Sequence, residues 1–457
     1  ETAFFRGLVP LYGLARMRQV DFFRRKVYDN VEYTGSAVRA PETVVFMKKT
    51  LLKNYAKLIA RVGANIQKGQ RVVITAQLDQ PQFVCTLVEE CYLAGAADVR
   101  VEWQDQRLEK LASKFETVKE LASVPYWQEQ KLAYNAETLP VTIKLLSADP
   151  DGMRGADREK LTLASMARLA ITKPYSDRMT NRHQWCVAAV PSVGWAKKIF
   201  PEERANSAME RLWELILETS RADGKDPLTD WMWHNRALRD KCDKINALGL
   251  ASLEYRSANG TNLKVGLIEK AQFIAGKKST VDGKYFNPNI PTEECFTTPK
   301  RGQAEGIVYA VKPLSYGGEL IEDFWIRFEE GRAVACGAKK NQELLEKIIH
   351  MDEGAAYLGE CALVPYDSPV NRTGILFYNT LFDENACCHL ALGRGYSNTI
   401  VGFENYTKSD FAEMGVNDSS VHVDFMVGAE DLQITGVTKK GERVPVFENG
   451  TWAAALR

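Results

Sequence analysis

Hydrophobic and polar positions follow two different periods in the first half of the chain. After Met47 the apolar positions repeat at helical spacing, which predicts one buried helix face formed by Leu51, Tyr55, Leu58 and Ile59. Short β-rich runs follow at residues 71–75, 99–103, 141–146 and 186–190. Helical patterns lie between these runs, for example at residues 82–94 and 107–115. Strands that alternate with helices predict an α/β domain with a mostly parallel sheet.

A long predicted helix ends this part of the chain. Asp226 and Pro227 have the pattern of an N-cap followed by proline in the first turn, and the helix extends to about Leu248. Beyond it, short β-like runs are separated by Gly, Asn and Pro, and we expect them at residues 253–256, 263–267, 306–311, 319–328 and 332–335. A helix is predicted over residues 341–358. This pattern favours a β-rich α+β domain.

The sequence therefore predicts three parts. Residues 1–46 are rich in Phe and Arg and have no steady period, which indicates an N-terminal extension or a segment derived from cloning. Residues 47–248 form the predicted α/β domain, and residues 249–457 form the predicted β-rich domain.

Composition narrows the range of partners. Lys plus Arg and Asp plus Glu are 59 each, so the net charge gives no reason to expect a nucleic-acid or membrane partner. No run approaches the ~18 apolar residues of a membrane span. The 9 cysteines are scattered without a CxxC pair, which argues against a cysteine zinc site and fits the reducing cytoplasm.

Several catalytic motifs are absent from the sequence. There is no HExxH helix, no GxSxG elbow and no GxGxxG after the first predicted strand. Residues 276–279 (GKKS) are in the wrong register for a phosphate-binding loop. These absences exclude the commonest zinc-protease, serine-hydrolase and nucleotide-binding signatures.

Of the 5 histidines, His183, His234 and His350 have ordinary structural interpretations in a polar loop, on a helix and at a helix end. His422 lies in a strand-like run, VHVDF, where it shares one face with Asp424. The pair fits a metal site and a buried His–Asp hydrogen bond equally well.

His389 lies in the run LFDENACCHLALGRGY, which we interpret as helical after Asp383, Glu384 and Asn385. A histidine inside such an apolar run needs a polar partner, either a metal or a carboxylate. The pattern favours Asp383 and Glu384 as helix caps over groups that orient His389. Arg394 could equally bind a peptide carbonyl or form an ion pair with an acid.

Three embedded acids complete the candidate chemistry. Glu360 lies in LGECALVP between apolar residues, and Glu293 and Glu294 lie in NPNIPTEECF, after a proline-rich loop and before an apolar run. Buried acids are rare without a partner. Histidines together with embedded acids form the ligand mixture of a two-metal hydrolase that uses zinc, cobalt or manganese.

Longer motifs make the chain recognisable. The C-terminal half contains NIPTEECFTTP, KPLSYGGELIEDF, LGECALVP, FYNTLFDENACCHLALGRGY and GVNDSSVHVDFMVG. The N-terminal half contains VGANIQKGQRVVITA and LVEECYLAGAADVRVEW. These segments resemble the aminopeptidase T / aminopeptidase S family of metallopeptidases, from about Met47 to the C-terminus.

The resemblance implies a cytoplasmic homodimer that acts on peptides with a free N-terminus. It implies a catalytic C-terminal domain that holds two divalent ions per subunit, zinc, cobalt or manganese. The metal ligands that it implies are Glu294, Glu360, His389, His422 and Asp424. Tyr396 matches the active-site tyrosine of the family.

Our mechanistic hypothesis gives three of these positions distinct roles. Glu360 bridges the two ions, Glu293 is the general base, and Tyr396 donates a hydrogen bond to the developing oxyanion. The alternatives are a dinuclear hydrolase of another amide or ester bond and a non-catalytic α/β scaffold. Bound metal and the response to N-acetylated peptides distinguish them.

Overall fold

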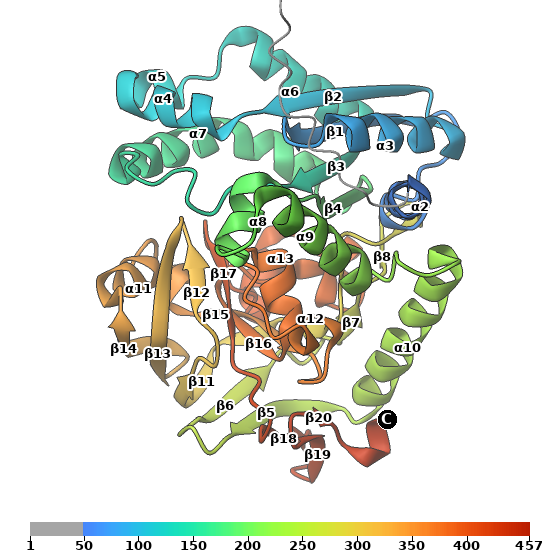
Figure 1. The fold of residues 1–457 in the computed structure, drawn as a ribbon. Coiled ribbons are helices and arrows are strands. Elements are labelled where there is room, and N and C mark those ends of the chain that lie inside the picture. The colour runs from blue at the N-terminus through green and yellow to red at the C-terminus, as the bar shows by residue number, and fades with distance from the viewer. Residues whose placement is uncertain (1–48) are drawn as a thin grey trace, which may run out of the picture. The chain divides into compact units, whose positions relative to one another are not determined.

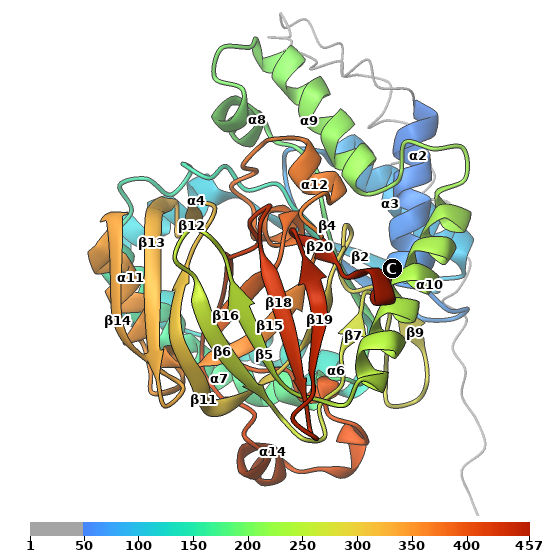
Figure 2. The same ribbon diagram turned by 90° about the horizontal axis from the view of Figure 1, so that it is seen from below.

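The computed structural model describes residues 49–457, which belong to a single structural unit (Figures 1 and 2). The predicted extension at residues 1–46 lies outside the described residues. The division at residues 248–249 stays a prediction, so we call residues 49–248 the N-terminal part and residues 249–457 the C-terminal part.

A parallel sheet forms the centre of the N-terminal part. Within residues 49–248 its strands are in the order β2-β1-β3-β4, and every pairing is parallel. Their bounds are β1 Arg71–Gln77, β2 Asp98–Gln104, β3 Val141–Leu146 and β4 Trp185–Ala189. The α/β prediction is confirmed. The run RVVITA is almost continuously apolar because helices cover the sheet, as Figure 1 shows.

Helices precede, connect and follow these strands. They are α2 Lys49–Leu58, the π-helix η1 Ile59–Gly63, α3 Pro81–Ala94, α4 Gln106–Phe115, α5 Val118–Ala122, α6 Tyr126–Thr138, α7 Arg158–Met179, α8 Val193–Ile199, α9 Ala205–Thr219 and α10 Pro227–Ala247. The predicted start of α10 is confirmed, since the Asp226 side chain accepts the Thr229 N–H. Every helix of residues 49–457 is too short or too polar to span a membrane.

The C-terminal part is built mainly from two antiparallel sheets. Within residues 250–457, the 9-stranded sheet has the order β12-β13-β11-β6-β5-β18-β19-β20, and β14 pairs with β13 (Figure 2). Its bounds are β5 Leu250–Arg256, β6 Asn262–Leu267, β11 Pro299–Tyr309, β12 Leu314–Tyr316, β13 Glu319–Glu329, β14 Arg332–Lys340, β18 Gln433–Thr438, β19 Arg443–Glu448 and β20 Thr451–Trp452.

The second sheet of the C-terminal part has 5 strands among the described residues, in the order β17-β16-β15-β10-β7. They are β7 Ile274–Ala275, β10 Cys295–Thr297, β15 Leu358–Leu363, β16 His389–Gly393 and β17 His422–Met426. A separate hairpin pairs β8 Lys278–Ser279 with β9 Tyr285–Phe286. The remaining helical elements are α11 Gln342–Ile349, η2 Gly354–Ala356, α12 Pro369–Arg372, α13 Thr380–Asp383, η3 Glu384–Ala386, η4 Ser397–Thr399, η5 Phe403–Asn405, α14 Lys408–Met414 and η6 Ala454–Leu456.

Two helix predictions in this part are wrong. The helix predicted over residues 341–358 ends at Ile349, because Asp352 accepts the N–H groups of Ala355 and Ser420 and starts a separate turn. In the run that contains His389, the helical part ends at Ala386, and residues His389–Gly393 form strand β16 between β15 and β17. Its residues are buried on both faces, so their uniform apolarity does not distinguish a strand from a helix.

The chain that leads into the PTEE motif is attached to the N-terminal part. Val187 of β4 donates its N–H to the Pro288 carbonyl at 2.6 Å, and the Ile290 N–H returns to the Val187 carbonyl at 3.0 Å. Asn287 donates its N–H to the Gly63 carbonyl at 2.8 Å. The parallel sheet thereby holds the backbone immediately before Glu293 and Glu294.

Candidate metal centre

The register of the five-stranded sheet brings the predicted ligands onto one face. Glu360 on β15 pairs with Ala391 on β16, and Ala391 pairs with Asp424 on β17. His389 and His422 lie two residues from Ala391 and Asp424, so both point to the face that carries Glu360.

Glu294 joins the same face from the neighbouring strand. Phe296 of β10 pairs with Ala362, which pairs with His389. Glu294 lies two residues before Phe296 and therefore projects to the side that carries His389. Four adjacent strands thus present their acids and imidazoles to one place.

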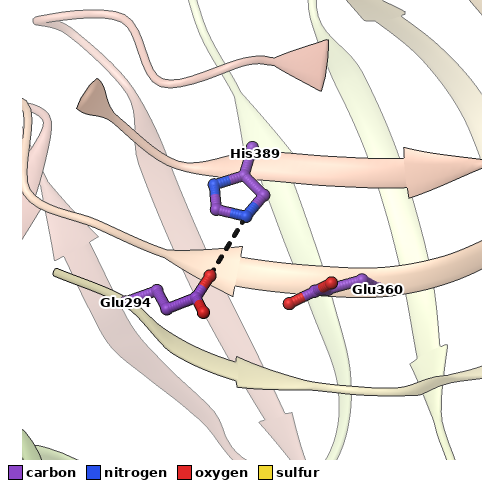
Figure 3. A group of neighbouring side chains, drawn as sticks. All are labelled: Glu294, Glu360 and His389. Carbon is purple, nitrogen blue, oxygen red and sulfur yellow. Dashed lines mark ion pairs between the residues drawn. The ribbon is translucent and has the colours of Figure 1, made fainter. Parts of the chain in front are cut away.

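Two overlapping groups of side chains form the candidate centre. Figure 3 shows the first, Glu294, Glu360 and His389, with His389 Nε2 3.3 Å from Glu294 Oε2. In the second, His422 Nε2 lies 3.1 Å from Glu360 Oε2 and 3.2 Å from Asp424 Oδ1. In each group the ligand atoms lie within 4.8 Å of one another. Glu360 belongs to both groups.

The backbone orients both imidazoles for metal binding. His422 Nδ1 lies 2.7 Å from the Arg394 carbonyl, and His389 Nδ1 lies 3.3 Å from the Cys387 carbonyl. A carbonyl can only accept, so each Nδ1 carries the proton and each Nε2 faces the acids. This arrangement is typical of metal-binding histidines.

The electrostatics of the cluster favour positive charge. Glu360 is 4% exposed and Asp424 is 7% exposed. Burial raises the pKa of the Glu360 carboxyl. Burial opposes a charged imidazole at His389, but the hydrogen bond to Glu294 and the nearby carboxylates raise its pKa to about 10. The negative charge of these carboxylates can be balanced by protonated imidazoles or by divalent cations. The mixture of imidazole and carboxylate donors fits such cations.

Tyr396 lies beside the second group. Its hydroxyl is 3.3 Å from His422 Nε2, and its ring contacts the Phe296 ring edge-on at 5.7 Å between centroids. Burial and the nearby carboxylates raise the phenol pKa well above its usual value. Tyr396 therefore stays protonated and can donate a hydrogen bond into the cluster.

Glu293 points away from its neighbour Glu294. Its carboxylate pairs with both terminal nitrogens of Arg221, with Nη2 2.9 Å from Oε2, and His234 Nε2 lies 3.9 Å from Oε1. Its own N–H donates to Asn385 Oδ1 at 2.7 Å. Glu293 belongs to neither candidate metal group, so Glu294 is the member of the pair that joins the candidate ligands.

The capping interpretation of Asp383 and Glu384 is wrong. Asn379 caps the short helix α13, and Asp383 at the end of that helix accepts the N–H groups of Phe377 and Asn379. Glu384 is close enough to Asp424 and Glu294 that burial and their charges raise its pKa well above the usual range. Arg394 has an exposed side chain, and its carbonyl accepts from His422.

Sequence reasoning missed Lys278 and Arg221. The Lys278 ammonium lies 5.0 Å from the centre of the Tyr396 ring and 5.1 Å from that of Phe296. Burial lowers the pKa of Lys278, opposed by the charges of Glu294, Glu360 and Glu384. Lys278 belongs to the GKKS segment. This segment carries no signal for a position beside the cluster, because the residues that surround Lys278 in the fold are distant in the sequence.

Comparison with known proteins agrees with the motifs. The family described as thermophilic metalloprotease (M29) matches residues 48–452. Aminopeptidase AmpS of Bacillus subtilis (strain 168) is 38% identical over 403 residues, which cover 88% of this chain and 98% of that protein. Aminopeptidase T of Thermus thermophilus is 38% identical over 405 residues, 88% of this chain and 98% of that protein.

Solved structures include a close match in fold. Wild-type AmpT from Thermus thermophilus superposes with a TM-score of 0.82 at 37% identity, and the match covers 89% of this chain and 100% of that chain. The resemblance seen in the motifs, the antiparallel C-terminal sheets and the parallel N-terminal sheet all agree with this match. The chain therefore belongs to the M29 metalloprotease family.

Proposed function

We propose that this protein is a metal-dependent aminopeptidase that releases single N-terminal residues from peptides. The observation that carries the proposal is the convergence of Glu294, Glu360, His389, His422 and Asp424 on one face of a sheet in an M29 metalloprotease. Relatives that cover nearly the whole described chain are named aminopeptidases, which supports the same activity.

The centre is proposed to hold two divalent ions, zinc, cobalt or manganese. Glu294, Glu360 and His389 would hold one ion, and Glu360, His422 and Asp424 would hold the other. Glu360 belongs to both groups, so it would contribute to the binding of both ions. Imidazole and carboxylate ligands accept each of these metals, so the ligands alone do not select one.

The residues around the centre supply the remaining chemistry. When bound, the ions polarise the scissile carbonyl and lower the pKa of water towards neutrality. Tyr396 is proposed to donate a hydrogen bond to the oxyanion, in line with its protonated phenol beside His422.

Glu293 is proposed as the general base, and this role requires its carboxylate to leave Arg221 during the reaction.

We also propose a cytoplasmic homodimer. All nine cysteines lie within the described residues and are free thiols, which fits a reducing compartment. Helices α4, α6 and α7 carry exposed large apolar side chains, which are typical of subunit interfaces: Leu108, Leu111, Phe115, Tyr126, Trp127, Leu163 and Met166. Light scattering of the purified protein tests the dimer.

The deciding experiment is hydrolysis of free-amine and N-acetylated peptides after chelation and after addition of Zn²⁺, Co²⁺ or Mn²⁺. We expect metal-restored release of single N-terminal residues from the free-amine peptides alone. Cleavage of both sets would favour a general amide hydrolase. A lack of release and of bound metal would favour a scaffold.

A further inference from the structure

Lys278 brings a cation to the ligand face of the metal cluster from outside the five-stranded sheet. It lies on β8, whose hairpin partner β9 places Phe286 opposite it. Its side chain is partly buried. Its ammonium lies 5.0, 5.1 and 5.7 Å from the ring centres of Tyr396, Phe296 and Trp185, respectively. These rings come from the cluster, from β10 and from β4 of the N-terminal part.

The aromatic rings account for the charge of this lysine but leave its hydrogen bonds unmade. Ring faces attract an ammonium without accepting N–H bonds in the way that oxygen does. Among residues 49–457, no acceptor lies within hydrogen-bond distance of Lys278 Nζ and no carboxylate lies within ion-pair distance, so its contacts are the three ring faces. A lysine has three donors and no acceptor. Because the side chain is only partly buried, these donors are open to an acceptor on a bound molecule.

A purely charge-balancing role fits this geometry poorly. A lysine that neutralises an acid lies in contact with it, as Lys340 contacts Glu322 at 2.5 Å elsewhere in the molecule. The charges of Glu294, Glu360 and Glu384 act on Lys278 only at longer range. The rings therefore hold a charged donor beside the cluster and beside Tyr396, the proposed oxyanion donor.

We propose that Lys278 is a catalytic residue whose ammonium donates to the carbonyl oxygen of the first peptide bond and to the oxyanion that replaces it. This inference rests on the proposed aminopeptidase function. Water adds to the carbonyl carbon, and the C=O π electrons move to the oxygen. The oxyanion then collapses, the C–N bond breaks, and the proton from water passes through the base to the leaving amine. Lys278 keeps its protons throughout and acts only through hydrogen bonds and charge.

The test compares Lys278→Met and Lys278→Gln with Lys277→Met as the matched control. Lys277 is the adjacent residue, is exposed, and its ammonium lies over the Tyr285 ring at 4.3 Å. Loss of an oxyanion donor lowers kcat by about 10²–10³-fold, and we expect this loss in both Lys278 variants but not in the control. Metal content, measured by mass spectrometry of the purified proteins, should match the wild type.

A second measurement separates catalysis from folding. A phosphinic pseudo-dipeptide mimics the tetrahedral oxyanion, whereas the free product amino acid does not. The inhibition constant of the phosphinate should rise by about the same factor as kcat/KM falls, while that of the amino acid changes by less than about threefold. Using two variants keeps the test open if one of them fails to fold.

Three results would overturn the inference. The first is a kcat of the Lys278 variants within about threefold of wild type. The second is an unchanged inhibition constant of the phosphinate in these variants. The third is a loss of activity that is explained by lost metal. A wild-type protein that releases no residue from any peptide would instead refute the proposed function, so the two failures are distinguishable.

Discussion

At the scale of single residues, the adjacent acids Glu293 and Glu294 have opposite environments. Neighbouring side chains of an extended segment project to opposite sides, so one acid meets His389 while the other meets Arg221. Glu294 is thereby gathered with the candidate ligands. Glu293 forms a bidentate ion pair, which is a strong and directional interaction for a carboxylate.

Glu293→Gln tests whether this acid takes part in the reaction. If Glu293 is the general base, turnover should fall by about 10²–10⁴-fold because the amide cannot accept the proton. Metal content should stay at the wild-type level, because Glu293 is in neither candidate group. Steady-state kinetics and metal analysis measure both effects.

Glu343→Gln, at an exposed position in the first turn of α11, is the control and should leave both quantities unchanged. Near-normal turnover of Glu293→Gln combined with a lower melting temperature would limit Glu293 to its ion pair with Arg221.

At the scale of elements, the pairing of β16 with β17 determines where His422 lies. Gly393 pairs with His422 at the end of β16 and has a φ of +100°. Its N–H donates to the Tyr357 carbonyl at 2.8 Å. A Cβ at this position would collide with the backbone of Val421, immediately before His422.

Gly393→Ala should therefore weaken both the fold and the metal site. The strained backbone alone costs about 1–3 kcal/mol, and relief of the collision would displace the start of β17. We expect a lower melting temperature and weaker metal binding, measured by thermal unfolding and by titration with Zn²⁺.

Gly441→Ala is the matched control, since Gly441 has a φ of +84° but no atom near its added Cβ. Gly441→Ala should lower the melting temperature through backbone strain but should leave the metal affinity unchanged. Equal metal affinity in the two variants would contradict the role of the β16–β17 register.

Another element contact gives a pH-dependent prediction. His183 joins the end of α7 to β3, with Nδ1 3.0 Å from the Met179 carbonyl and Nε2 3.3 Å from Thr142 Oγ1. Burial lowers the pKa of His183 below the usual value of about 6.5 for histidine. The folded state then binds fewer protons than the unfolded state below about pH 6.5, so stability should fall as the pH drops through this range.

His183→Gln should remove this part of the pH dependence. The melting temperature of the wild type should drop more than that of the variant between pH 8 and pH 5.5. The exposed His350, replaced by Gln, is the control and should behave like the wild type. If the melting temperature depends on pH in the same way in all three proteins, a contribution from His183 is ruled out.

At the scale of the whole molecule, the ligand face depends on both parts of the chain. Backbone hydrogen bonds tie residues 287–290 to Gly63 and Val187, and Arg221 follows α9 of the N-terminal part. Trp195 of α8 donates its indole N–H to the Phe377 carbonyl, and the Trp195, Phe377 and Phe382 side chains lie in one hydrophobic cluster. The position of Glu294 therefore depends on contacts between the two parts.

Metal removal should lower the stability of the protein as a whole. A ligand that binds only the folded state raises the free energy of unfolding by about 4 kcal/mol when its free concentration is about a thousandfold above its Kd. We expect a chelator to lower the melting temperature and excess Zn²⁺ or Co²⁺ to restore it, as measured by calorimetry. Glu360→Gln removes the ligand common to both groups and should lose most of this response. A melting temperature independent of metal would contradict a built metal centre.

The sequence by itself determined the features that depend on local pattern. Strand and helix periods predicted the parallel sheet, and the capping pattern of Asp226 and Pro227 predicted the start of α10, because both features depend on neighbouring residues. The period of VHVDF placed His422 and Asp424 on one face. Long motifs identified the family, and the candidate ligands that they implied lie together in the structure.

The tertiary structure alone decided what depends on contacts between distant segments. The apolar run around His389 is a strand because two neighbouring strands pair with it, and no local period records such pairing. Arg221 meets Glu293 across 72 positions of sequence, which assigns the two adjacent acids to different environments. Lys278 reaches the cluster because a hairpin folds it over rings from three other segments. Burial and charge act through space, so these roles follow from the fold and not from the order of residues.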